Sequence, residues 1–126
     1  MPGREPPTID AYLESARSRL DRVEPSDLAR EIRDGAVVVD LRDSARRDLE
    51  GTFPGAIEME YTFLEWRLAP SSATRLDIDA NTKVIMMCND GYSSSLAAAR
   101  LQELGLPNAT DLVGGYRAWK KFTDLK

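Results

Sequence analysis

Histidine is absent from this chain of 126 residues. Histidine is the side chain that most often acts as a general base or a metal ligand, and it activates serine and cysteine nucleophiles in paired sites. Its absence excludes both Cys-His and Ser-His pairs. Any nucleophilic cysteine in this protein must therefore be activated by other means.

Cysteine is nearly absent as well, because Cys88 is the only one in the chain. A single cysteine cannot form an internal disulfide, and no apolar run approaches the roughly 18 residues that a membrane-spanning helix needs. The sequence also has no signal-peptide pattern. We therefore expect a cytoplasmic protein that does not bind a membrane.

An excess of positive charge is also missing. The chain has 17 Lys and Arg residues against 21 Asp and Glu residues, which gives a formal net charge of -4 at pH 7. Such a chain has no overall positive field to attract a nucleic acid. We therefore expect no nucleic-acid partner.

Length and composition are those of one folded domain. Hydrophobic residues make up 42% of the sequence and charged residues 30%, the balance of a globule with a core. Residues 1–7 contain three prolines and are expected to form a flexible leader. We expect a single domain over residues 8–126, in which residues 8–22 form an extra N-terminal helix capped by Thr8.

Two apolar runs predict buried strands. Residues 36–41 and 83–88 are nearly continuous hydrophobic segments, as in the strands of a parallel sheet. Shorter extended pieces are expected at 56–59 and 109–113. Periodicity and turn residues predict helices between Pro25 and Gly35, near 45–49, near 61–68, between the Cys88 loop and Gly105, and over 116–122. The alternation predicts an α/β fold with helices on both faces of the sheet.

The segment from Cys88 to Ser94 lies between the second buried strand and a helix. Open α/β sheets bind ligands beyond the carboxyl ends of their strands. The start of a helix carries partial positive charge, and the N–H groups of a tight loop can hold an anion. Both effects lower the pKa of a cysteine thiol from its ordinary value of about 8.5. The segment therefore predicts a thiolate nucleophile that needs no histidine.

The residues after Cys88 suit such a loop, although plainer interpretations stay open. Gly91 can adopt a positive φ, and Ser93, Ser94 and Ser95 offer hydroxyl donors at the rim. A lone cysteine at the end of an apolar strand is, however, usually a small buried hydrophobic residue. Ser94 could likewise do no more than cap the helix.

Four motifs follow one another along the chain. They are Val38-Val39-Asp40-Leu41-Arg42, Gly51-Thr52-Phe53-Pro54-Gly55-Ala56-Ile57, Cys88 to Ser94, and Leu112-Val113-Gly114-Gly115-Tyr116-Arg117-Ala118-Trp119. Together, over residues 24–122, they resemble the rhodanese-like (sulfurtransferase) domain family in its single-domain form. Four motifs in order are far more specific than any one of them.

This resemblance implies a three-layer domain with a central parallel sheet of about five strands. It also implies a sulfurtransferase that moves a sulfane sulfur through a persulfide on Cys88, without a metal or an organic cofactor. The donor would be thiosulfate or a persulfide, and the acceptor a thiol, cyanide or a protein. The implied substrate-binding residues of the loop are Asn89, Asp90, Gly91, Tyr92, Ser93 and Ser94.

Asp40 and Arg42 match the Asp-x-Arg motif of the family. The pair could be a structural ion pair at the end of the strand, or Arg42 could contact the substrate. Gly114, Gly115 and Trp119 match the closing motif, and we expect them to be structural.

The sequence departs from the family pattern at three positions. Thr52 replaces the usual histidine, and Ser93 stands where the family often has an arginine that helps to hold an anionic donor. Asp90 would oppose such a donor and raise the pKa of Cys88 unless its carboxylate turns outward to solvent, so a persulfide would be preferred to thiosulfate. We hypothesise that Arg42 or Arg67 supplies the missing positive charge.

Two other functions compete with sulfur transfer as interpretations of the sequence. Phosphatase or arsenate reductase chemistry needs a longer loop ending in an arginine, and the first arginine after Cys88 is Arg100, well inside the helix. A non-catalytic redox-sensing or protein-binding module of the same fold stays open, because the loop is acidic and has no arginine. The retained cysteine favours the enzyme.

Overall fold

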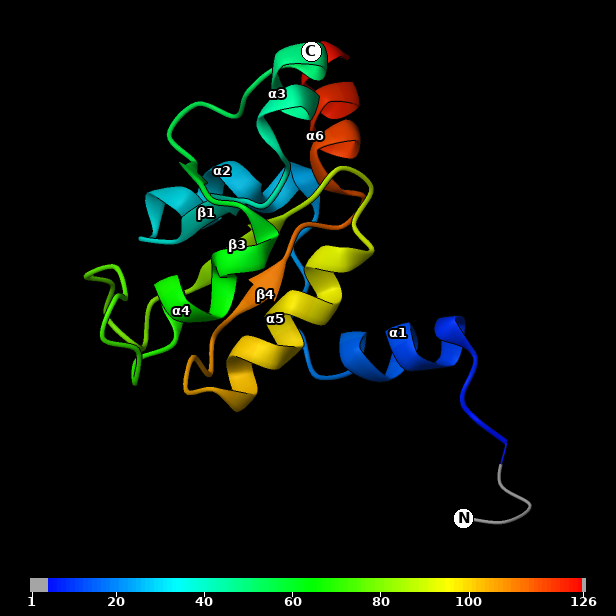
Figure 1. Ribbon diagram of the computed structural model, residues 1–126. Coiled ribbons are helices and arrows are strands. Elements are labelled where there is room, and N and C mark those ends of the chain that lie inside the picture. Colours follow the sequence, from blue (N-terminus) through cyan, green and yellow to red (C-terminus); the bar gives the residue numbers. More distant parts are fainter. Residues whose placement is uncertain (1–4, 126) are drawn as a thin grey trace.

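A computed structural model describes residues 5–125, so the first four residues of the expected leader lie outside the described part of the chain. Its strands form one parallel sheet with helices packed on both faces (Figure 1), which confirms the predicted α/β fold. The elements in chain order are α1 (Ile9–Arg17), α2 (Pro25–Arg33), β1 (Val37–Asp40), α3 (Ser44–Glu50), β2 (Ile57–Glu58), the 3-10 helix η1 (Tyr61–Phe63), α4 (Leu64–Leu68), β3 (Val84–Met87), α5 (Ser93–Glu103), β4 (Thr110–Asp111) and α6 (Gly115–Asp124).

The sheet has the strand order β2-β1-β3-β4, and each neighbouring pair is parallel. About five strands were expected, whereas residues 5–125 contain four, together with an isolated bridge between Val23 and Leu112 beside β4. Pro25 begins α2 two residues after Val23. Because the chain must turn into that helix, only one residue can pair along this edge.

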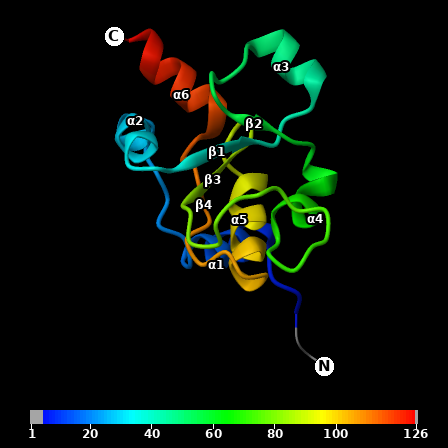
Figure 2. The same ribbon diagram turned by 90° about the vertical axis from the view of Figure 1, so that its left-hand side faces the viewer.

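The central strands are buried on both faces, as their apolar runs predicted. Along β3, Val84 and Met86 join the core beneath α4 and α5, whereas Ile85 and Met87 join the core beneath α2 and α6. Figure 2 shows these two pairs of helices on opposite sides of the sheet. The alternation follows from the two-residue period of a strand. It fixes the ends of β1 and β3 firmly between two packed layers.

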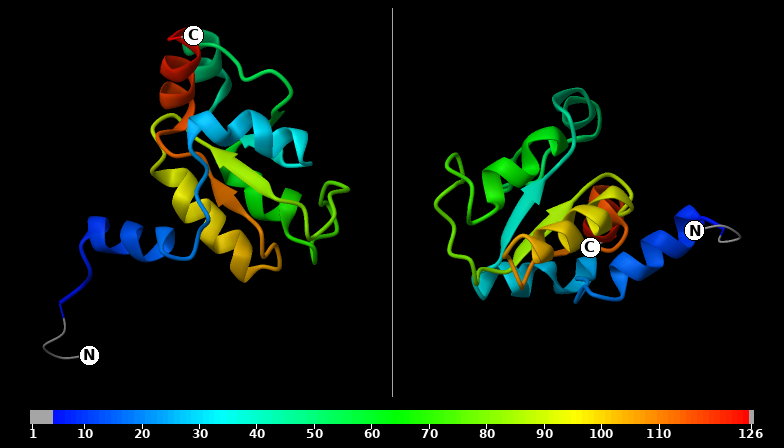
Figure 3. Two further views of the ribbon diagram at one scale, coloured as in Figure 1. Left: turned by 180° about the vertical axis from the view of Figure 1, so that it is seen from behind. Right: turned by 60° about the horizontal axis from the view of Figure 1, so that its bottom comes forward.

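Helix α1 is shorter than predicted. Thr8 caps it by accepting a hydrogen bond from the Ala11 N–H at 3.0 Å, but the helix ends at Arg17 instead of residue 22. The chain leaves the helix because Leu20 packs against the core and Val23 pairs with Leu112. Helix α1 packs against α5 and projects outward from the two main layers (Figure 3). Within residues 5–125, no helix has both the length and the apolar character to cross a membrane.

Candidate active site

The ends of two adjacent strands define the site. Asp40 pairs with Met87 in the register of β1 and β3, so the residues that follow both strands emerge at the same edge of the sheet. The Leu41 N–H donates to the Met87 carbonyl at 2.9 Å and extends this pairing by one residue. Arg42 and Cys88 are thereby brought to one place, although 46 positions separate them in the sequence.

Two main-chain N–H groups point at the Cys88 sulfur. It accepts hydrogen bonds from the N–H of Gly91 at 3.2 Å and from the N–H of Ser94 at 3.4 Å. Gly91 has a φ of 85°, which curls the loop around the sulfur. Ser94 lies in the first turn of α5, so the positive end of that helix also faces the sulfur. The loop therefore directs two N–H groups and the start of a helix at the sulfur, as the sequence predicted.

These contacts decide the acidity of the thiol. Burial alone would raise the pKa of Cys88, but hydrogen bonds from Ser94, Ser93 and Gly91 outweigh burial and lower the pKa below its ordinary value. The Ser94 hydroxyl donates to Asp111 at 2.8 Å, so its single hydrogen is engaged there. The main-chain N–H is therefore the donor that Ser94 directs at the sulfur.

The start of α6 holds the loop from the other side. The N–H groups of Tyr116 and Arg117 donate to the carbonyls of Cys88 and Asn89, at 2.8 and 3.1 Å. A Cβ on Gly115 would lie 2.4 Å from the Cys88 carbonyl oxygen, so only glycine permits this approach. Trp119 packs on Phe53 and Tyr116, with ring centroids 4.5 and 5.5 Å away. The closing motif thus builds the floor of the loop.

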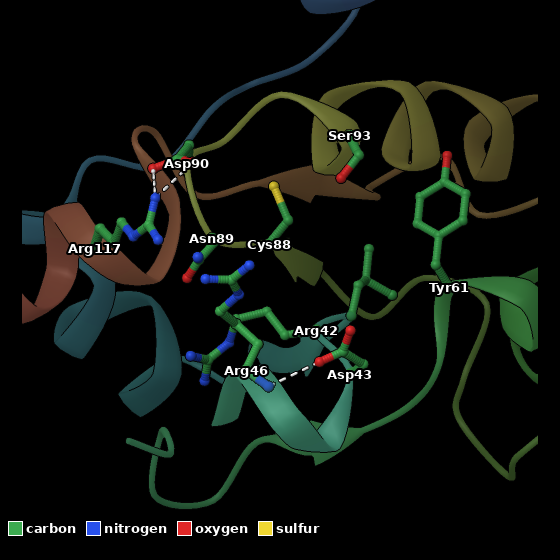
Figure 4. A pocket seen from close by; sticks show the side chains of 10 residues that line it. Arg42, Asp43, Arg46, Tyr61, Cys88, Asn89, Asp90, Ser93 and Arg117 are labelled. Carbon is green, nitrogen blue, oxygen red and sulfur yellow. Dashed lines mark hydrogen bonds and ion pairs between the residues drawn. The ribbon is translucent and has the colours of Figure 1, made fainter. Parts of the chain in front are cut away.

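A pocket of about 410 Å³ opens in front of the sulfur. Figure 4 shows Cys88 in its middle, with Asp90 and Arg117 on one side and Ser93 and Tyr61 on the other. The residues that line it are Leu41, Arg42, Asp43, Arg46, Tyr61, Cys88, Asn89, Asp90, Ser93 and Arg117. Three arginines and two aspartates face the same space, so the lining is charged but nearly balanced.

The remaining loop residues lie outside this lining. Gly91 and Ser94 reach the sulfur through their N–H groups, and the side chain of Ser94 is fully buried. Tyr92 is 63% exposed, and the Arg17 guanidinium lies 5.6 Å from the centroid of its ring. No side-chain hydrogen bond caps α5, so the alternative in which Ser94 caps the helix is not found.

Arg42 forms a buried pair with Asp40. Its Nε and Nη2 donate to the two carboxylate oxygens at 3.0 and 2.8 Å, and Nη2 also donates to the Gly51 carbonyl at 2.9 Å. Its carbon Cζ lies 3.9 Å from the centroid of the Tyr116 ring. Such contacts join the strand end to α6 and favour the structural interpretation, although Arg42 also lines the pocket.

Arg67 is placed elsewhere. It lies at the end of α4, donates to the Thr74 carbonyl at 2.7 Å, and lines a separate pocket with Glu58, Glu60 and Phe63. This arrangement does not support the hypothesis that Arg67 supplies positive charge at Cys88. The guanidinium of Arg67 binds the loop that follows α4, and the sequence of the helix does not predict this contact.

Arg46 and Arg117 are the pocket cations that sequence reasoning missed. Arg117 donates to both Asp90 carboxylate oxygens at 3.1 and 3.0 Å and to both Glu50 oxygens at 2.9 Å. Arg46 donates to Glu50 at 3.2 Å. The only signal was the position of Arg117 in the closing motif. A raised pKa of Cys88 was expected unless the Asp90 carboxylate turned outward; that carboxylate is half exposed and pairs with Arg117, and the pKa of Cys88 is lowered.

Comparison with known proteins adds a family and several relatives. Residues 24–122 match the family model of the Rhodanese-like domain. The thiosulfate sulfurtransferase GlpE of Pseudomonas entomophila is 33% identical over 103 residues, which cover 82% of this chain and 87% of that protein. The adenylyltransferase and sulfurtransferase UBA4 of Yarrowia lipolytica is 27% identical over 106 residues, or 83% of this chain but only 25% of that longer protein.

A solved structure from Rhodopseudomonas palustris is similar over nearly the whole chain. It is described as a protein of unknown function and possible tyrosine phosphatase. The two share 28% sequence identity and superpose with a TM-score of 0.84, covering 98% of this chain and 96% of the other. The similarity therefore includes α1, which precedes the residues matched by the family model.

Proposed function

Because this chain belongs to the Rhodanese-like domain family, we propose that it is a sulfurtransferase whose Cys88 carries a sulfane sulfur as a persulfide. One observation supports this most directly. The Cys88 sulfur accepts two main-chain N–H groups and opens onto a pocket, so it can carry negative charge beside a substrate. The related GlpE proteins are named as thiosulfate sulfurtransferases.

The proposed reaction has two steps. The Cys88 thiolate attacks the outer sulfur of thiosulfate, the S–S bond of the donor breaks, and sulfite leaves with the bonding electrons. A persulfide anion remains on Cys88. An acceptor such as cyanide or a thiolate then attacks the outer sulfur of that persulfide, forms thiocyanate or a new persulfide, and regenerates the Cys88 thiolate. Every atom and charge is accounted for without a metal or an organic cofactor.

The charges of the pocket bear on the choice of donor. Thiosulfate carries two negative charges, and Asp90 is the loop residue that would repel it. Arg117 pairs with Asp90, and Arg42 and Arg46 also face the pocket. We therefore propose that thiosulfate is a usable donor, and that a small-molecule or protein persulfide can replace it.

The loop residues have different roles in this proposal. We assign the substrate contacts to Asn89, Asp90 and Ser93, which line the pocket, while Gly91 and Ser94 hold the sulfur through their N–H groups. We assign Tyr92 to the outer rim, because its ring is exposed. Arg42 positions the end of β1 through Asp40 and adds positive charge to the pocket.

Phosphatase chemistry is a weaker candidate, although the structural relative from Rhodopseudomonas palustris is described as a possible tyrosine phosphatase. A phosphoryl group has three oxygens that phosphatases hold with a bidentate loop arginine. Here the arginines of the pocket come from α6 and from the region of α3, and Arg46 and Arg117 are engaged with Glu50. A non-catalytic module would not need two N–H groups directed at the sulfur.

The open pocket bears on the acceptor, and the need for a reduced thiol bears on the compartment. A pocket that opens to solvent admits a thiol, cyanide or the cysteine of a protein acceptor. A lone thiol that must remain reduced between turnovers suits a reducing compartment. We therefore propose a cytoplasmic enzyme.

Cyanolysis tests the proposal. Wild-type protein is incubated with thiosulfate and cyanide, and thiocyanate is measured beside the Cys88→Ala variant. We expect turnover in the wild type and none above background in the variant. The Ser71→Ala variant is the matched control, because it removes an exposed hydroxyl outside the pocket lining, and its turnover should equal that of the wild type. Equal turnover with and without Cys88 would refute the proposal, and release of phosphate from an aryl phosphate would favour the phosphatase.

A further inference from the structure

Two arginines that precede the family-matched region contact the Cys88 loop. Arg17, the last residue of α1, donates through Nη2 to the Gly91 carbonyl oxygen at 2.7 Å. Arg22, next to the Val23 bridge, donates through Nη2 to the same oxygen at 3.2 Å. We call this pair of contacts the Gly91 clamp. Both guanidinium groups are partly buried, so water competes poorly for the carbonyl.

Gly91 has opposite contacts at its two ends. Its N–H points to the Cys88 sulfur at 3.2 Å, while its carbonyl points away to Arg17 and Arg22. Its φ of 85° lies in a region where the backbone of a glycine has wide freedom. The rest of the chain must therefore hold this residue in one orientation. Hydrogen bonds to the carbonyl restrict the dihedral angles that Gly91 can adopt, and so help to keep its N–H directed at the sulfur.

A buried aspartate anchors the same clamp. Asp111 at the end of β4 is fully buried and accepts the Ser94 and Ser95 hydroxyls at 2.8 and 2.7 Å. Arg22 donates to both of its oxygens, at 2.8 and 3.2 Å. Arg17 in turn donates through Nε to the Ser95 hydroxyl at 3.1 Å. The first turn of α5 is thus held from beneath, and that turn supplies the Ser94 N–H to the sulfur.

We propose that Arg17 and Arg22 are positioning residues of the active site, and that the segment from α1 to Val23 holds the loop in its thiolate-binding form. The proposal rests on the proposed function for its biological meaning. What it states directly is that these residues stabilise the Cys88 thiolate. It makes α1 part of the site, although α1 precedes the residues matched by the family model.

The lone cysteine allows a direct test, because every thiol signal of the protein comes from Cys88. The rate of alkylation by iodoacetamide is measured against pH for wild type, Arg17→Met and Arg22→Met. The midpoint is the pH at which the rate reaches half its maximum. We expect it to rise by about 1 pH unit in each variant, which lowers the thiolate fraction about tenfold at a pH below both midpoints. Arg17→Met is the decisive variant, because Arg22→Met also leaves the buried Asp111 with less compensation and can unfold the chain.

Arg19→Met is the matched control. Arg19 lies in the same segment and pairs with Glu103 at 3.2 Å, away from the loop, and its removal changes the net charge by the same amount. Its midpoint should equal that of the wild type. The charged groups that face Cys88 across the pocket, Arg42, Asp43, Arg46, Asp90 and Arg117, are the same in all these proteins.

Three outcomes decide the matter. A raised midpoint in folded Arg17→Met together with an unchanged midpoint in Arg19→Met supports the clamp. Equal midpoints in wild type and Arg17→Met, or equal rises in Arg17→Met and Arg19→Met, overturn it. Because alkylation needs no sulfur donor, the result stands even if wild-type protein shows no cyanolysis, which would refute the proposed function alone.

Discussion

The guanidinium of Arg117 lies 3.0 Å from the carboxylate of Asp90, so a residue of α6 pairs with the one acidic residue of the Cys88 loop. Both side chains are about half exposed, at 48 and 49%, and both line the pocket. The pair links a negative charge that would repel an anionic donor to a cation that would attract it. The balance between the two therefore bears on the affinity for thiosulfate.

Breaking this pair from either side should have opposite effects. Arg117→Met leaves the Asp90 charge unpaired in the pocket, and we expect KM for thiosulfate to rise about tenfold. Asp90→Asn removes the negative charge that repels the donor, while Arg117 stays paired with Glu50, and should lower KM. Lys120→Met on the same helix, whose partner is Asp124, is the control and should leave KM unchanged. Steady-state kinetics that gave one KM for all four proteins would show that the pair does not influence the donor.

The pH profile of Cys88 is predicted from the sign of its pKa shift. The pKa of the folded thiol is lowered, so alkylation of native protein should reach half its maximum at a lower pH than alkylation of protein unfolded in urea. The thiolate then contributes stability that is fully present above the unfolded pKa and is lost as pH falls through the folded pKa. A native midpoint at or above the unfolded one would contradict the hydrogen-bonded sulfur described above.

Arg42 should act mainly on stability. Its side chain is 2% exposed and pairs with a fully buried Asp40. Arg42→Met leaves that carboxylate without its partner, and we expect a loss of about 3–5 kcal/mol in the free energy of unfolding. The exposed Arg33→Met serves as the control, with a change of less than about 0.5 kcal/mol. Urea denaturation measures both. Unchanged stability with a higher KM would instead make Arg42 a substrate contact.

The lowered pKa of Glu50 predicts how the stability of the protein depends on pH. Hydrogen bonds from Arg117 and Asn89 lower the pKa of this carboxyl from 4.5 to about 2. Because the folded pKa is depressed, the stabilisation is fully present above the unfolded pKa and is lost as pH falls through the folded value. The urea midpoint of wild type should exceed that of Glu50→Gln at pH 7, and the two should converge near pH 2. A constant difference across this range would mean that Glu50 acts through shape alone.

Local sequence signals predicted much of the fold. The apolar runs of β1 and β3, the Pro25 start of α2 and the Thr8 cap of α1 each depend on neighbouring residues, and each is found as expected. The predicted end of α1 was wrong. Val23 pairs with Leu112, which lies 89 positions away, and such long-range pairing outweighs helical periodicity.

The part of the site formed by one continuous segment could be predicted, whereas the part formed by residues of separate elements could not. The Cys88 loop is one continuous segment, so its N–H groups and glycine could be anticipated. Arg117 and Arg46 reach the pocket from other elements, and Arg67 is drawn away by the Thr74 carbonyl. The roles of these arginines depend on how the helices pack, which periodicity does not specify.

The most direct test of the account is the mass of the intact protein after incubation with thiosulfate. We predict that one sulfur atom is added, that peptide fragmentation places it on Cys88, and that cyanide removes it again as thiocyanate. Protein of unchanged mass, in a sample whose Cys88 is still readily alkylated, would contradict the claim that this thiolate accepts sulfane sulfur.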